Sequence, residues 1–187
     1  MDKPQKILLT SSRNPTPRIR AFCNDLARVM PNIECVNRGK MSMEKVAEKA
    51  LERRAYNVAI VERWQGNPDR IEFFNIESVG LVPISPRLYI AHIRLQRDFV
   101  TKKLKPANST AITKPVEADS LDLAYSLSKI LDLPLLSKAE ESTDYSVAIE
   151  VSHDANRRVQ ITFMQLPQRL EIGPRITLRR VLWETNK

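Results

Sequence analysis

The stretch ILLTSSRNPTPR, residues 7–18, decides the fold. Its start, Ile7 to Thr10, is a short apolar run followed by a polar loop, which predicts a buried strand. Thr16 is a good helix N-cap, and Pro17 suits the first helical position because the N–H that proline lacks would have no helical partner there. Apolar residues then recur at helical spacing as far as Pro31, at Ile19, Phe22, Leu26, Val29 and Met30.

The pattern of a strand followed by a helix continues along the first half. Residues 33–36 predict a second strand, and Ser42 is placed to cap a helix whose apolar stripe runs to residue 51. Residues 58–61 form a continuous apolar run, typical of a strand covered on both faces, and residues 70–76 predict the next strand. The order βαβαββ predicts an α/β fold.

The second half carries a similar but weaker pattern. After a strand at residues 87–95, a basic, proline-containing stretch that begins at Lys102 and ends near Pro115 is the best candidate for a boundary. Asp119 or Ser120 is placed to cap a third helix, and three strands follow, at residues 146–151, 158–164 and 175–183. The hairpin at 58–73 resembles the one at 147–161. Two hairpins can match by chance, so a duplication remains one of two explanations.

The composition indicates a folded, basic protein. The chain has 187 residues, of which 42% are hydrophobic, enough for one domain or for two small halves that share a core. Thirty Lys and Arg outweigh 22 Asp and Glu, and the net charge of +8 favours a polyanionic partner, most commonly nucleic acid. The alternative is a solvated basic surface that has no specific partner.

Catalytic and metal-binding signatures are absent from the sequence. Cys23 and Cys35 form no C-x-x-C pair and lie near no histidine, so a zinc site is unsupported, and His92 and His153 lie far apart in the chain. No phosphate-binding glycine motif occurs among the four glycines. We therefore predict no catalytic residue, no metal and no cofactor. No signal peptide and no membrane-spanning run are found, which predicts a cytoplasmic protein without a membrane partner.

The loops that follow the predicted strands carry the candidate site. Loops after parallel strands emerge at one edge of a sheet, and the N-terminus of the helix capped by Thr16 adds positive potential there. The alternative is that the basic side chains lie in these loops only because loops are exposed to solvent. Trp64, at the end of a predicted strand, could stack on a base or could pack against the protein. The predicted phosphate-binding residues at this edge are Arg13, Arg18, Arg20, Arg38, Lys40, Arg63 and Asn67.

The last strand predicts a second group of cations. Gly173 can adopt a positive φ, and Pro174 suits the entrance of a strand. Arg175 and Arg179 are four residues apart, so a regular strand would place both on one face, about 13 Å apart. This row could bind about two nucleotides of RNA backbone. The alternative is an edge strand whose charges block aggregation.

Four motifs in order along the chain resemble those of the Brix-domain family. Residues 7–18 resemble the opening motif of that family, and Asn37-Arg38-Gly39-Lys40 resembles its Arg-Gly-Lys loop. Residues 62–71 are similar to its Gly-Asn-Pro segment, in which Arg70 is a further predicted RNA-binding residue, and residues 170–178 are similar to its E-I-G-P-R motif. No motif matches between residues 100 and 145, and Ile176 stands where many relatives have Phe.

This resemblance implies a fold and a function. The fold is one Brix domain over residues 1–187, made of two similar α/β halves at about 1–95 and 116–187, each resembling the anticodon-binding domain of class IIa aminoacyl-tRNA synthetases. The function is non-catalytic binding of ribosomal RNA precursor during rRNA processing and subunit assembly, with ribosomal proteins or other assembly factors as further partners. The chain looks like an archaeal member.

Two alternative functions remain open from the sequence. One is an RNA-modifying or RNA-cleaving enzyme on the same scaffold, which would need a cleft with a perturbed acid or base. The other is a protein-binding scaffold whose basic loops contact acidic partners. Competition by RNA at moderate salt would separate the scaffold from the RNA-binding factor.

Overall fold

The computed structural model describes residues 4–100, 104–137 and 144–183. Lys102 and Lys103 of the predicted linker lie outside the described residues. A short 3-10 helix, Gln96–Asp98, follows the fifth strand. The helices and strands, in chain order, are β1 (Lys6–Ser11), α1 (Pro17–Val29), β2 (Ile33–Cys35), α2 (Met43–Glu52), β3 (Ala55–Trp64), β4 (Asn67–Glu77), β5 (Gly80–Arg94), β6 (Thr110–Thr113), α3 (Ala118–Leu131), β7 (Leu135–Leu136), β8 (Val147–His153), β9 (Val159–Gln165), β10 (Leu170–Glu171) and β11 (Arg175–Leu182).

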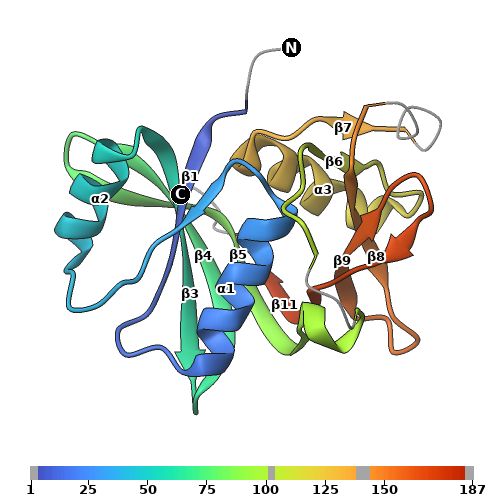
Figure 1. The fold of residues 1–187 in the computed structure, drawn as a ribbon, viewed down its shortest axis with the longest axis horizontal. Helices are drawn as coiled ribbons and strands as arrows, with labels where there is room; N and C mark the ends of the chain where they lie inside the picture. Colours follow the sequence, from blue (N-terminus) through green and yellow to red (C-terminus); the bar gives the residue numbers. More distant parts are fainter. Residues whose placement is uncertain (1–3, 101–103, 138–143, 184–187) are drawn as a thin grey trace.

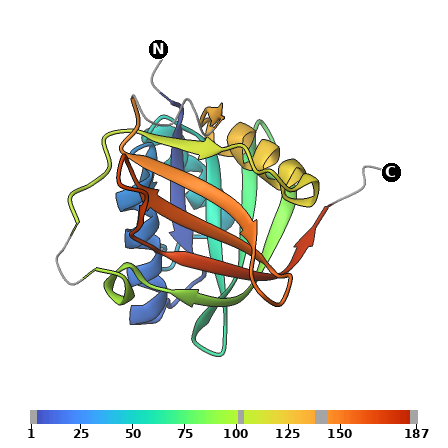
Figure 2. The same cartoon turned by 90° about the vertical axis from the view of Figure 1, so that its right-hand side faces the viewer.

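One continuous sheet of 11 strands organises the described part of the chain, in the order β2-β1-β3-β4-β5-β11-β9-β8-β6-β7, with β10 paired to β9. β1 is parallel to both β2 and β3, and β3, β4 and β5 form an antiparallel meander. β5 pairs with β11, which joins the second half to the first. The later strands run across the earlier ones in Figure 2, as expected of a strongly twisted sheet.

The two halves repeat one strand order. Within the first half the strands follow β2-β1-β3-β4-β5, and within the second β7-β6-β8-β9-β11, each with a parallel β-α-β start. The hairpins that resemble each other in sequence, β3–β4 and β8–β9, occupy equivalent places. β6 was not predicted: residues 110–113 were interpreted as part of a polar linker, whereas they are buried and pair with β7 and β8.

Local capping explains where the first two helices begin. The Thr16 hydroxyl accepts the N–H of Ile19, and Pro17 is the first helical residue, as predicted. Ser42 accepts the N–H of Lys45 at the start of α2, also as predicted. The third helix begins earlier than expected, at Ala118, after Glu117, and no side chain caps it.

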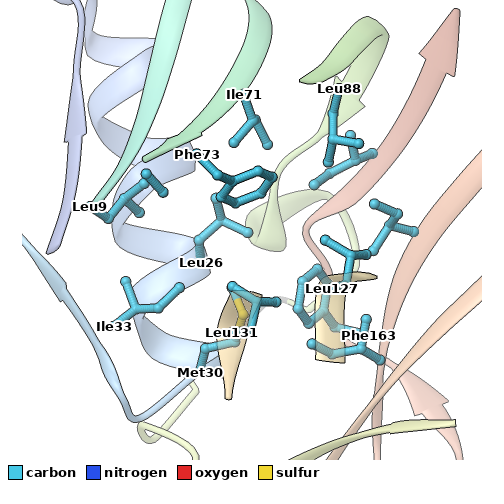
Figure 3. Close-up of a pocket in the computed structure, with 14 residues that line it drawn as sticks. Leu9, Leu26, Met30, Ile33, Ile71, Phe73, Leu88, Leu127, Leu131 and Phe163 are labelled. Carbon is cyan, nitrogen blue, oxygen red and sulfur yellow. The ribbon is translucent and has the colours of Figure 1, made fainter. Parts of the chain in front are cut away.

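The core lies on both faces of the sheet. The larger cluster packs α1 and α3 against the sheet, and the smaller packs α2 against β1, β3 and β4. Between α1 and α3, Leu26 and Met30 face Leu127 and Leu131 across a cavity of about 40 Å³ (Figure 3). Every residue that lines this cavity is apolar, which indicates a packing void rather than a site for a polar ligand.

Candidate nucleic-acid interface

One edge of the sheet gathers the loops that the sequence singled out. β1, β2 and β3 are mutually parallel, so their carboxyl ends emerge together. β5 runs in the same direction as β3 because two antiparallel steps separate them, and β11 therefore begins at the end of β5. In Figure 1 the β3–β4 hairpin and the start of α1 lie together at the bottom of the view. This edge is the predicted binding edge.

Thr16 connects the start of α1 to the β3–β4 turn. Its hydroxyl donates a hydrogen bond of 2.7 Å to the Gly66 carbonyl, in addition to capping the helix. Gly66 has a φ of +82° and leaves room for Thr16, whose methyl carbon would lie 3.5 Å from an added Cβ. The hairpin tip is therefore held against the helix N-terminus, where backbone N–H groups favour anions.

Arg38 is buried and is not accessible at the surface of the binding edge. It is 6% exposed, and its Nε donates to the Met41 carbonyl at 2.8 Å while Nη2 contacts Met43 Sδ. Burial lowers the pKa of the guanidinium; nearby Glu62 opposes this and nearby Arg13 adds to it. Arginine nevertheless stays charged in proteins. Arg38 thus clamps the β2–α2 loop and supplies positive charge from below the surface.

Three exposed cations at this edge make no hydrogen bond or ion pair with the described residues. Arg13 follows β1, Lys40 follows β2 and Arg63 lies at the end of β3. We call Arg13, Lys40 and Arg63 the edge cations. Exposed cations that form no ion pair with the described residues are well suited to contact phosphate groups.

Arg18 and Arg20 lie on the first turns of α1 and are partly engaged. Arg18 Nη2 donates to the Ile93 carbonyl at 3.0 Å, and Arg20 Nη1 donates to the Pro15 carbonyl at 2.6 Å. Both residues are exposed, so the remaining guanidinium donors face solvent. They tie the start of α1 to Ile93 of β5 and to Pro15 in the preceding loop.

The two predicted RNA-binding residues of the Gly-Asn-Pro segment differ in their exposure and in their side-chain contacts. Asn67 is exposed and pairs with Trp64 across the turn. Arg70 is half-buried, and its Nε lies 3.1 Å from Glu72, which Arg87 also approaches at 3.5 Å. Arg70 therefore belongs to an ion-pair network within the sheet.

Arg175 lies at the same edge, but its guanidinium is already paired with a carboxylate of the protein. It faces Arg94 across the β5–β11 pairing, and its guanidinium makes a bidentate ion pair with Glu171, which raises its pKa. Arg94 and Arg175 lie 4.4 Å and 5.3 Å from the centroid of the Phe99 ring. The sequence did not point to Arg94 or Phe99, because only the pairing of β5 with β11 brings them to Arg175.

The regular row of two cations predicted on β11 is not found. Register shifts flank Leu178, and Arg179 is the extra residue of a bulge, so the alternation behind the 13 Å spacing does not hold. Arg179 binds Asp69 at 2.6 Å and donates to the Ile90 carbonyl. Thr177, which lies between the two arginines in the sequence, is fully buried. Both arginines therefore join elements of the fold.

One polar cluster could suggest catalysis, but its geometry does not. Ser120 Oγ lies 3.4 Å from His153 Nδ1, and Glu117 contacts the same nitrogen. A nucleophile–base relay needs the acid and the nucleophile on different ring nitrogens. Ser120 is also fully buried. Among the described residues, no three His, Cys, Asp or Glu side chains group as metal ligands.

The α/β fold and the four motifs resemble those of the Brix-domain family, and comparisons with known proteins agree. No family model matches the chain. The chain is 26% identical, over 97% of its length and 86% of the relative's, to a probable Brix domain-containing ribosomal biogenesis protein of Pyrococcus horikoshii. A similar protein of Aeropyrum pernix is 27% identical over 83% of the chain and 86% of the relative.

Solved structures show the same fold. The crystal structure of a probable ribosomal biogenesis protein from Aeropyrum pernix K1 matches with a TM-score of 0.76 and 26% identity, covering 93% of this chain and 95% of that one. Mil, an archaeal Imp4-like protein, matches with a TM-score of 0.69 at 21% identity, over 95% and 99% of the two chains. The resemblance to the Brix-domain family that the four motifs predicted is confirmed.

In the described residues, no helix has the length and apolar character needed to cross a membrane.

Proposed function

We propose that this chain is a non-catalytic RNA-binding factor in ribosome biogenesis, which binds ribosomal RNA precursor during rRNA processing and subunit assembly. The observation that carries the proposal is that Arg13, Lys40 and Arg63 lie at or after the carboxyl ends of the parallel strands β1, β2 and β3, the edge at which α1 also begins. The relatives named as ribosomal biogenesis proteins support the same role.

The proposed mechanism depends on the cationic side chains that are accessible to RNA phosphates. Arg13 and Lys40 come from two loops and Arg63 from the end of β3, and each can neutralise a phosphate without breaking a hydrogen bond or ion pair with the described residues. Such contacts position an RNA backbone and carry little sequence information. The protein would hold an RNA segment in a conformation that differs from the final one and release it as assembly proceeds. The same proposal places the protein in the cytoplasm, with ribosomal proteins or other assembly factors as further partners.

The alternatives receive less support. A hollow of about 160 Å³ at the ends of β6 and β8 contains Glu117 and Glu150, but Glu117 is engaged by His153 and Glu150 by Arg169. It therefore offers an enzyme no free acid–base pair. A protein-binding scaffold would use the same cations with acidic side chains. The net charge of +8 and the helix N-terminus favour a phosphate backbone.

Two finer parts of the sequence prediction remain predictions. One is the division into halves at about residues 1–95 and 116–187, which the repeated strand order supports. The other is the likeness of each half to the anticodon-binding domain of class IIa aminoacyl-tRNA synthetases.

We expect RNA binding to weaken steeply with salt. If about five phosphates are neutralised, the slope of log affinity against log salt should be roughly −3.5, because single strands contribute about −0.7 per contact. Fluorescence anisotropy of a labelled single-stranded fragment of ribosomal RNA precursor, titrated at a series of salt concentrations, measures this slope. A slope near zero would contradict the proposal.

We also expect no chemical change in the bound RNA. The described residues bring no nucleophile together with a free base, and the Ser120–His153–Glu117 contacts fall on one ring nitrogen. Incubating the purified protein with ribosomal RNA precursor and divalent metal ions should leave the RNA intact on a denaturing gel and unmodified by mass spectrometry. Turnover that persists on repurification and disappears in His153→Ala would instead support an enzyme.

A further inference from the structure

Trp64 is a large aromatic side chain presented to solvent at the binding edge. It ends β3 and is 68% exposed. The side chains around it in the hairpin, Arg63, Gln65 and Asn67, are exposed and polar. An exposed tryptophan among polar and cationic neighbours differs from the apolar patch that usually marks a protein–protein contact.

The backbone beneath Trp64 is held in place. The β3–β4 ladder continues to the Trp64–Asn67 pair, and the turn between them uses positive φ values at Gln65 and Gly66. The hydrogen bond from Thr16 to the Gly66 carbonyl fixes the turn against α1. A ring on a fixed backbone loses little conformational freedom when a ligand packs on it.

Strand alternation places the ring on a definite face of the sheet. Ile60 packs in the core under α2 and Val61 in the core under α1. The extra residue of the bulge near Arg63 lies on β4, so alternation along β3 continues and Trp64 shares the face of Glu62. Glu62 interacts electrostatically with Arg38, whose loop carries Lys40 and whose neighbour is Arg13. The ring therefore lies on the α2 face of the sheet, which also carries the Glu62 carboxylate that interacts with Arg38.

We propose that Trp64 stacks on a base of single-stranded RNA while Arg13 and Lys40 bind backbone phosphates at the same edge. This inference rests on the proposed function and adds the kind of RNA that is bound. In a duplex the faces of the bases are covered by their neighbours, whereas the bases of single-stranded loops and ends are free to stack on aromatic side chains. Stacking tolerates any base, so the site selects strandedness more than sequence.

The test compares Trp64→Ala with Trp64→Phe on three probes. The probes are a single-stranded oligouridylate, an abasic oligomer of the same phosphate count, and a blunt RNA duplex. Trp64→Ala should weaken oligouridylate binding about 5- to 150-fold, the measured range for one stacked base, and leave abasic binding unchanged. Trp64→Phe should recover most of the loss because it keeps an aromatic face. The duplex should bind the wild-type protein and Trp64→Ala equally.

A spectroscopic readout reports the contact directly. The chain has two tryptophans, so Trp183→Phe leaves Trp64 as the only indole fluorophore. In that variant oligouridylate should quench the fluorescence, and the abasic oligomer should quench it much less. If Trp64→Ala leaves oligouridylate affinity unchanged while the salt slope persists, RNA binding stands and the stacking site is wrong; Trp64 would then serve a protein contact. If no probe binds in a salt-dependent way, the proposed function itself fails.

Discussion

Replacing Arg13, Lys40 and Arg63 together by glutamine is expected to weaken single-stranded RNA binding about 100-fold at about 0.1 M salt. Each phosphate contact contributes about 0.7 to the slope of log affinity against log salt, which corresponds to about fivefold in affinity at that concentration. The slope should fall from roughly −3.5 to roughly −1.4. Salt-dependent anisotropy titrations of wild type and variant measure both quantities, and the two lines should converge near about 1 M salt.

The fold should tolerate these three changes. The edge cations make no hydrogen bond or ion pair with any described residue, so the free energy of unfolding should change by no more than about 0.5 kcal/mol. A matched control, Arg54→Gln with Lys105→Gln and Lys129→Gln, removes the same three charges from the net charge of +8. Arg54 precedes β3, Lys105 lies near the end of α1, and Lys129 is in the last turn of α3.

The control variant distinguishes binding at the edge of the sheet from a general effect of net charge on RNA affinity. If the edge of the sheet binds RNA, the control triple should keep most of the affinity and most of the salt slope. Equal losses in the two triples would mean that net charge alone attracts RNA, and the edge would then lose its special role.

The parts of the fold that the sequence predicted well depend on short-range interactions. Thr16 and Ser42 cap helices through hydrogen bonds to residues three positions ahead, so the caps are visible in the sequence. The buried strand 58–61 is visible because both of its faces are apolar. Such elements can be predicted because the residues that stabilise them are close together in the sequence.

The elements that were missed depend on partners distant in the chain. β6 begins in a polar stretch, and its place in the sheet comes from β7 and β8 and from a hydrogen bond of Thr110 to the Val29 carbonyl in α1. β5 was predicted from residue 87 but begins at Gly80. Pro83 and Pro86 argue against a strand in sequence, yet the pairing with β4 continues past Pro83.

The site was predicted in position but not in detail. The convergence of loops follows from parallel strands, which the βαβ pattern already predicts. Which cations remain free does not follow from the sequence. Arg179 forms an ion pair with Asp69, which lies 110 residues earlier in the chain, and Arg38 hydrogen-bonds to the backbone of its own loop. Only three-dimensional packing separates these engaged arginines from Arg13 and Arg63.

Gly173→Ala is expected to destabilise the protein by about 2–5 kcal/mol. Gly173 has a φ of +66°, as its position before the last strand predicted, and an L-residue there costs about 1–2 kcal/mol. An added Cβ would also lie 2.5 Å from Phe99 Cδ2 and 3.2 Å from the Gln96 Cα, and overpacking of this kind costs about 1–3 kcal/mol. For a chain of this size the melting temperature should fall by roughly 4–20 °C, measured by calorimetry or circular dichroism.

Two further variants identify the cause of the loss. Gly39→Ala has a similar φ of +52° with no atom within 4 Å of the added Cβ, so it should show the backbone cost alone. The guanidinium groups of Arg94 and Arg175 both contact the Phe99 ring, which limits how far the ring can move away from a new methyl group. In a Phe99→Leu background the smaller side chain should make Gly173→Ala less costly. A loss no larger than that of Gly39→Ala, unchanged by Phe99→Leu, would show that the packing of Gly173 against Phe99 contributes nothing.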